Sequence, residues 1–185
     1  MINYAVGIDY SMTCPSICVH NGLKNWSLSN CKFYFLTNKK RCIINNQIFN
    51  SDFHLDFSTQ EERFNNISDW AISVIPKFSI VGLEDYAFSA TGVVFNIGEC
   101  TGLLKHKLWK NNYNFKTYAP SQIKKFATTK GNANKMMMYE NFVSETEFDI
   151  SSIIHCKEGD SPMSDIIDSY YIAKLAFSNN LNLPK

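Results

Sequence analysis

The chain has 185 residues, 45% of them hydrophobic and 19% charged, and a formal net charge of +1. That length fits one domain (residues 1–185) with a single sizeable core, and the small net charge does not by itself predict a polyanionic partner. No apolar run reaches the roughly 18 residues that span a bilayer, and the N-terminus lacks the basic start and small-residue cleavage site of a secretory signal. We therefore expect a cytoplasmic protein with no membrane partner.

Six cysteines occur without C-x-x-C pairs and without a following histidine at zinc-like spacing. Disulfide frameworks are typical of small secreted domains, which this chain does not resemble. We therefore expect buried, reduced thiols at Cys14, Cys18, Cys31, Cys42, Cys100 and Cys156.

The N-terminal third predicts a meander of three antiparallel strands. Residues 2–9 alternate large apolar side chains with smaller or polar ones, which indicates a core strand with Asp9 at its C-terminal end. Two further strands are predicted at 16–20 and 32–37. The segment 38–57 has no clear period, and we interpret it as a hairpin excursion.

The rest of the chain alternates helices and strands. A helix is predicted to begin at Thr59, because Ser58 or Thr59 can cap it, and to end at Pro76. A short apolar strand then carries Glu84 at its end. The later elements are, in order, a loop over 85–91, a helix over 93–111, a strand over 113–118, a short helix from Pro120, a loop over 128–134, and helices over 133–143 and 162–178. This order is typical of an α/β protein with a central mixed five-stranded sheet, three strands antiparallel and two parallel, flanked by helices.

Four carboxylates fall at positions where a site is usually assembled. Asp9 and Glu84 each end an apolar strand, and ligands bind at the carboxyl ends of strands in open α/β sheets. Asp165 and Asp168 are three apart on a predicted helix, so they share one face. The alternatives are that the first pair caps turns and that the second pair favours a helix N-terminus.

An all-oxygen ligand set of this kind suits Mg²⁺ or Mn²⁺. Two ions per active site, about 3.5–4 Å apart, would support phosphodiester hydrolysis. The stretch between Glu99 and Glu140 contains no acidic residue but carries Lys105, Lys107, Lys110, Lys116, Lys124, Lys125, Lys130 and Lys135, with aromatic residues between them. This composition indicates a phosphate-binding surface, although a solvated helix face is the alternative.

Four segments carry motifs in a fixed order along nearly the whole chain. They are Gly-Ile-Asp-Tyr-Ser at 7–11, Gly-Leu-Glu-Asp-Tyr-Ala-Phe at 82–88, the strand-loop-helix segment at 118–135, and Asp-Ile-Ile-Asp-Ser-Tyr-Tyr-Ile-Ala at 165–173. In combination they resemble the RuvC family of Holliday-junction resolvases, which belongs to the RNase H-like superfamily. Some departures, such as Tyr10 in place of the family's proline, resemble the divergent resolvases of phages or other viruses.

The resemblance implies a homodimeric endonuclease that nicks four-way DNA junctions in pairs. It carries Asp9, Glu84, Asp165 and Asp168 over as metal-binding, catalytic carboxylates, and it places Lys135 near the scissile phosphate. The family's base-contacting phenylalanine position is Ala87 here, so a neighbouring aromatic residue would have to replace it. The DNA-binding residues expected from charge and resemblance together are Lys105, Lys107, Lys124, Lys125, Lys130, Lys135, Tyr86 and Phe88.

Other interpretations of the same residues remain. An RNase H-like nuclease could act on other branched DNA or on RNA/DNA hybrids, and a catalytically inactive protein could keep the fold to bind DNA structures. Paired cuts require a two-fold assembly. The helix over 93–111 is apolar enough to form the dimer contact, or equally to be an ordinary core helix.

Overall fold

A computed structural model describes residues 4–85 and 94–181 of the chain. It has one mixed sheet of six strands in the order β4-β3-β2-β1-β5-β6. The strands are β1 (Tyr4–Asp9), β2 (Ser16–His20), β3 (Cys31–Leu36), β4 (Phe49–Asp52), β5 (Ser79–Glu84) and β6 (Asn114–Tyr118). The expected antiparallel meander of β1, β2 and β3 and the parallel strands β5 and β6 are confirmed.

The sixth strand adds to the interpretation of residues 38–57. The segment begins with a short 3-10 helix, η2 (Lys40–Cys42), and then makes a tight antiparallel turn, with a bridge between Asn45 and Asn50, as the expected hairpin would. The strand after this turn is β4, which also pairs in parallel with β3, a pairing that was not expected. β4 has only four residues, too few for a period in the sequence to be visible. Its anchor is Phe49, which is fully buried and stacks on Phe33 with ring centroids 5.1 Å apart.

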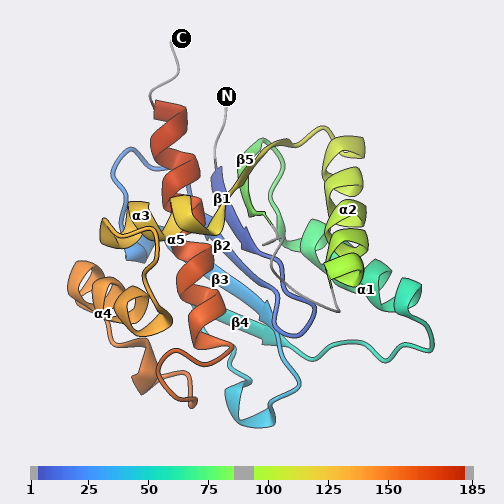
Figure 1. Cartoon of the computed structure of the whole chain (residues 1–185), viewed down its shortest axis with the longest axis horizontal. Coiled ribbons are helices and arrows are strands. Elements are labelled where there is room, and N and C mark those ends of the chain that lie inside the picture. Colours follow the sequence, from blue (N-terminus) through green and yellow to red (C-terminus); the bar gives the residue numbers. More distant parts are fainter. Residues whose placement is uncertain (1–3, 86–93, 182–185) are drawn as a thin grey trace.

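Helices cover both faces of the sheet (Figure 1). The α-helices are α1 (Gln60–Val74), α2 (Val94–Lys110), α3 (Pro120–Thr128), α4 (Lys135–Thr146) and α5 (Met163–Leu181), and the other 3-10 helices are η1 (Leu28–Asn30) and η3 (Ile150–Ser152). Thr59 caps α1 by accepting a hydrogen bond from the Glu62 amide, as its sequence position predicts. None of the described helices has the length and apolar character to cross a membrane.

Strand alternation divides the core into two clusters. Val6 and Ile8 of β1 point toward α1 and α2, where they pack with residues such as Leu104. On the other face, Phe33 and Phe35 of β3 pack under α4 and α5, around Tyr170 and Tyr171. The cysteines are free thiols, and five of the six are buried.

Two glycines allow α5 to lie directly on the sheet. Gly7 and Gly82 are register partners on the neighbouring strands β1 and β5. A Cβ atom at Gly7 would stand 2.1 Å from the amide nitrogen of Ala173 and 2.2 Å from the carbonyl oxygen of Ser169. A Cβ atom at Gly82 would stand 2.8 Å from Cγ2 of Ile172. The backbone of α5 therefore occupies space that any other residue type at Gly7 would fill.

Gly7→Ala should destabilise the protein by about 3 kcal/mol, because the added methyl group meets helix backbone that cannot move aside alone. For a chain of this size, the melting temperature should fall by roughly 6–12 °C. The matched control is Gly102→Ala on α2, where a Cβ atom meets nothing within 4 Å; this change should stabilise by about 0.5–1 kcal/mol. Equal effects of the two substitutions would contradict the close approach of α5.

Candidate active site

Asp9 and Glu84 lie side by side at one edge of the sheet. Each is the last residue of its strand, and the preceding residues, Ile8 and Leu83, are register partners on the parallel strands β1 and β5. Because side chains alternate along a strand, Asp9 points to the same face as Gly7, and Glu84 to the same face as Gly82. Both carboxylates therefore point toward the helix that covers the two glycines.

The start of α5 brings two more carboxylates to this edge. Asp165 lies in the first turn of the helix, and Asp168 immediately precedes Ser169, whose carbonyl oxygen contacts the Gly7 position. The electrostatic interactions of Asp9 include Asp165, Glu84 and Asp168. Four acids that are far apart in the sequence thus converge on one site.

Burial and mutual repulsion shift the protonation of these acids. The pKa of Asp9 is well above its ordinary value, first because the side chain is buried and then because of the charges of Asp165, Glu84 and Asp168. Burial, Glu84 and Asp165 raise the pKa of Asp168 to about 8. Burial also raises the pKa values of Glu84 and Asp165, and a hydrogen bond with Asp9 acts in the opposite direction on both. The site therefore favours the neutral form of these acids, and Asp168 in particular keeps a proton that an isolated carboxyl group would release at neutral pH.

The donor set fits a divalent cation. Oδ2 of Asp165 is buried and has no hydrogen-bond partner, which is costly unless something compensates its charge. All four side chains offer oxygen ligands, the type that Mg²⁺ prefers. Among the described residues, however, no three His, Cys, Asp or Glu side chains form a group that could hold a metal ion. The structure thus gathers the acids at one edge without forming a complete coordination shell.

Two of the predicted lysines reach the carboxylates. The Nζ atom of Lys135 donates a hydrogen bond to Oγ of Ser164 at 3.2 Å, and its charge lowers the pKa values of Asp165, Asp9 and Asp168. Lys124 on α3 lowers the pKa values of Glu84 and Asp168. These two cations offset part of the negative charge of the site.

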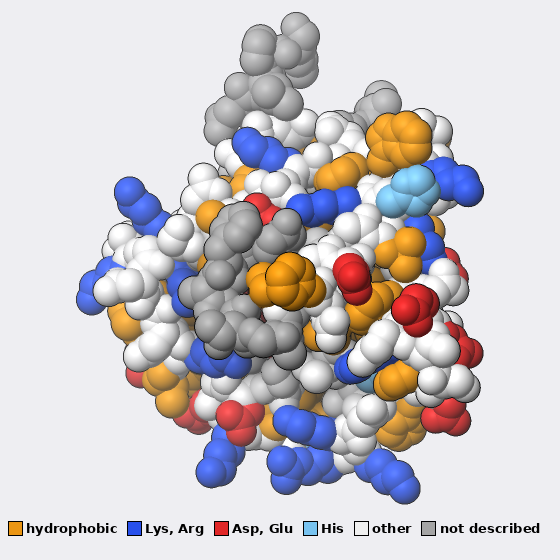
Figure 2. Space-filling model, turned by 45° about the vertical axis from the view of Figure 1, so that its right-hand side comes forward, with side chains coloured by type: hydrophobic (Ala, Val, Ile, Leu, Met, Phe, Trp, Pro, Cys, Tyr) orange, Lys and Arg blue, Asp and Glu red, His pale blue; other side chains and the backbone are white. Residues whose placement is uncertain are grey.

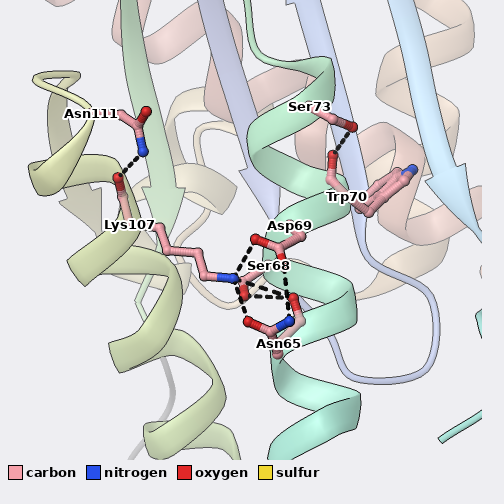
Figure 3. Close-up of polar contacts among 7 residues, drawn as sticks. All are labelled: Asn65, Ser68, Asp69, Trp70, Ser73, Lys107 and Asn111. Atoms are coloured by element: carbon pink, nitrogen blue, oxygen red, sulfur yellow. Dashed lines mark hydrogen bonds and ion pairs between the residues drawn. The ribbon is translucent and has the colours of Figure 1, made fainter.

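Lys125 and Lys130 are exposed on α3 and on the turn after it. Lys105 forms an ion pair with Asp85, the residue after Glu84, at 3.5 Å. Lys107 reaches from α2 to α1 and donates hydrogen bonds to Oδ1 of Asn65 at 2.8 Å and to Asp69 (Figure 3). Its ammonium group is therefore engaged within the protein.

The loop after β1 forms a wall of the site. A pocket of about 380 Å³ opens beside Asp9 and Glu84 and is lined by residues 10–13 of this loop. Arg63 of α1 donates a hydrogen bond to the carbonyl oxygen of Met12 at 2.8 Å, and the His54 ring is hydrogen-bonded to that of Thr13 at 3.0 Å. These two side chains hold the loop in position. The predicted base-contacting residues Tyr86 and Phe88 lie outside the described residues.

Sequence reasoning missed the residues that hold the acids in place. Gly7 and Gly82 each stand two positions before an acid, in Gly-Ile-Asp and Gly-Leu-Glu. Two strands with the same Gly-x-acid ending indicate a helix packed closely on the face that carries both acids, so this signal was available. The contacts of Ser164, His54 and Arg63 join segments that are far apart in the sequence, so no local sequence pattern predicts them.

Comparisons with known proteins identify the fold. No family model matches the chain, and no curated protein matches it in sequence. RuvC of Thermus thermophilus matches the structure with a TM-score of 0.59 and 18% identity over 96% of both chains. The same protein in complex with a Holliday junction substrate matches with a TM-score of 0.58, the same identity and the same coverage. The chain therefore has a RuvC-like, RNase H-like fold.

Asp168→Asn should stabilise the metal-free protein at neutral pH, because it removes a buried carboxyl group whose pKa is raised to about 8 in the folded protein and which therefore opposes folding at any pH above its ordinary pKa. We expect a gain of about 1 kcal/mol, or roughly 2–4 °C in melting temperature in the presence of chelator. Mg²⁺ should raise the melting temperature of the wild type but raise that of the variant less. The control is Asp56→Asn at an exposed position. It should change neither the melting temperature in chelator nor the rise in melting temperature that Mg²⁺ causes. A wild type that gains nothing from Mg²⁺ would argue against a metal site.

Proposed function

We propose that this protein is a Mg²⁺-dependent endodeoxyribonuclease that resolves four-way DNA junctions by paired two-metal-ion hydrolysis. The observation that carries the proposal is the convergence of Asp9, Glu84, Asp165 and Asp168 at one edge of the sheet, beside the cations Lys124 and Lys135. The similarity to an RuvC bound to a Holliday junction substrate supports the choice of DNA structure.

Each part of the site has a chemical role in this proposal. The four carboxylates would hold two Mg²⁺ or Mn²⁺ ions, which when bound supply an activated water and stabilise the leaving 3′ oxygen. The buried Oδ2 of Asp165 would thereby gain a partner. Lys135, hydrogen-bonded to Ser164, is held where its ammonium group can contact the phosphate that is cut. The loop over 10–13, held by Arg63 and His54, would limit the space on one side of that phosphate.

We further propose that the DNA backbone runs over α3 and the start of α4. Lys124, Lys125, Lys130 and Lys135 lie there, and Lys105 lies on α2 next to the site. Figure 2 shows Lys and Arg side chains spread over one face of the molecule, with acidic side chains among them. Such a mixed surface favours DNA binding through a few well-placed contacts rather than through a large uniform charge.

Cutting two strands symmetrically requires two copies of the site, so we propose a homodimer. α2 buries Cys100, Leu104 and Leu108 in the core, which is consistent with its interpretation as a core helix. The same helix leaves Phe95 and Trp109 79% and 68% exposed. These two side chains are the apolar residues that α2 offers to a second copy.

The decisive experiment is cleavage of a synthetic four-way junction by wild type and by Asp9→Asn, Glu84→Gln, Asp165→Asn and Asp168→Asn. Each variant should cut at least about 100-fold more slowly, since loss of even an outer-shell partner of a metal costs about 10–100-fold. Binding of the junction should persist, because lysines supply most of the affinity.

Asp56→Asn is the control for a lost surface charge and should cut at the wild-type rate. Activity in excess chelator would exclude the metal mechanism. Cleavage of flapped DNA or RNA/DNA hybrids at the junction rate would favour the alternative nuclease. Binding without cleavage in Mg²⁺ or Mn²⁺ would favour the inactive DNA-structure binder.

Lys124→Ala, Lys130→Ala and Lys135→Ala should each weaken DNA binding and flatten its salt dependence. Each lost phosphate contact should change the slope of log K against log salt by about 0.9. Lys135→Ala should also slow the cutting of bound DNA, because Lys135 alone of the three acts on Asp9. The matched control is Lys107→Ala: it should leave the slope unchanged and lower the melting temperature, because this lysine joins α2 to α1. A flatter salt dependence for Lys107→Ala would show that the assay reports the total charge of the protein rather than the position of each lysine.

A further inference from the structure

We propose that the turn after β3, residues Lys39, Lys40 and Arg41, is a second phosphate-binding surface that holds the DNA backbone on the far flank of the active site. We name this segment the β3 turn. The inference rests on the proposed function and extends it to a segment that the family motifs in the sequence do not cover.

Strand direction places the β3 turn at the catalytic edge. β2 runs antiparallel to both β1 and β3, so β1 and β3 run in the same direction, and β5 is parallel to β1. The C-terminal ends of β1, β3 and β5 therefore lie at one edge of the sheet. Asp9 and Glu84 stand at two of these ends, and the β3 turn follows the third.

The order of the strands puts the β3 turn opposite the lysines of α3. β6 lies on one side of the β1–β5 pair and leads directly into α3, whereas β3 lies on the other side, beyond β2. Neighbouring strands are about 4.8 Å apart, so β3 ends about 10 Å from β1. That span corresponds to about three nucleotides along one strand of a duplex, at 3.4 Å each. A strand cut at Asp9 would reach the β3 turn within a few phosphates.

Two contacts tie the β3 turn to the segment that leads into α5. The Nζ atom of Lys39 donates a hydrogen bond of 2.6 Å to the carbonyl oxygen of Ser161, and Ser161 is in turn hydrogen-bonded to Asp165. Cys42 at the end of the turn is buried, and its thiol lies 3.9 Å from the carbonyl oxygen of His155. The turn is therefore held at a fixed place beside one of the carboxylates.

The free cations of the turn are Lys40 and Arg41. Both are exposed, and the side chain of neither has a hydrogen-bond or ion-pair partner within the described ranges 4–85 and 94–181. Arg41 shares a shallow pocket with His155, Lys157 and Asp160, so a single acid there faces several basic groups. Basic side chains also gather along the lower edge of the face in Figure 2, the level at which the segment after β3 lies in Figure 1. Adjacent like charges without partners suit a polyanion, and the polyanion at this edge is the DNA backbone.

The test compares two double variants with the same change in net charge. Lys40→Gln/Arg41→Gln removes the free cations of the β3 turn. Lys24→Gln/Lys32→Gln removes two exposed lysines at the opposite edge of the sheet, after β2 and at the start of β3. Junction binding is measured against salt concentration in chelator, so that no DNA is cut. The first variant should flatten the slope of log K against log salt, reducing its magnitude by about 1 to 2. The second variant should leave this slope unchanged.

The position of the contact is tested with junctions in which the three phosphates on one flank of the cleaved bond are replaced by neutral methylphosphonates. On one of the two flanks, this replacement should make the wild type bind more weakly than it binds unmodified DNA. The Lys40→Gln/Arg41→Gln variant should bind the DNA modified on that flank and the unmodified DNA equally well. Both double variants should keep the wild-type melting temperature, because all four side chains are exposed.

The outcomes separate this inference from the proposed function. A wild type that cuts junctions, together with a Lys40→Gln/Arg41→Gln variant that keeps the wild-type salt slope, would overturn the role of the β3 turn and leave the nuclease proposal standing. The same loss for both double variants would also overturn it, because total charge would then explain the effect. A wild type that binds no junction would overturn both proposals.

Discussion

The site depends on the direct contact between a helix and two strands that lack side chains at the contact. At Gly7 the backbone of α5 fills the volume of a Cβ atom, and at Gly82 a side chain of α5 does so. This contact fixes the height and the position of α5 along β1, and hence where its first turn ends. Asp165 and Asp168 can reach the strand ends because of this contact. If side chains separated α5 from the strands, the helix would lie farther from the sheet. Asp165 and Asp168 would then form a pair separate from that of Asp9 and Glu84.

The gathering of acids opposes folding. Burial raises the pKa values of all four carboxyl groups, and repulsion between them adds to the shift at Asp9, Glu84 and Asp168, so the site stores unfavourable free energy that a bound cation would release. Lys124 and Lys135 offset part of this repulsion from α3 and α4. Under the proposed function these lysines also contact DNA, so the same charges would serve stability in the free protein and binding in the complex.

Patterns within one element could be predicted from the sequence, and contacts between elements could not. The strand ends at Asp9 and Glu84, the shared face of Asp165 and Asp168 and the mixed sheet all follow from periodicity and spacing. β4 was missed because four residues carry no visible period, and its place depends on Phe49 stacking on a residue of another strand. The engagement of Lys107 with α1 was missed for a similar reason: a lysine-rich stretch gives the charge but not the direction in which each side chain points.

Of the six strands in the described part of the chain, only β2 runs against the others, so the segments that follow β1, β3, β4, β5 and β6 all leave the sheet on the same side. Any of these segments can lengthen or shorten during evolution without disturbing the buried side chains of the sheet. Under the proposed function, such changes would alter which nucleic-acid shapes fit while the acids stay in place. In an architecture of this kind, substrate choice can evolve separately from the chemistry. Insertions at this edge of the sheet would change which substrate fits and leave the catalytic acids intact.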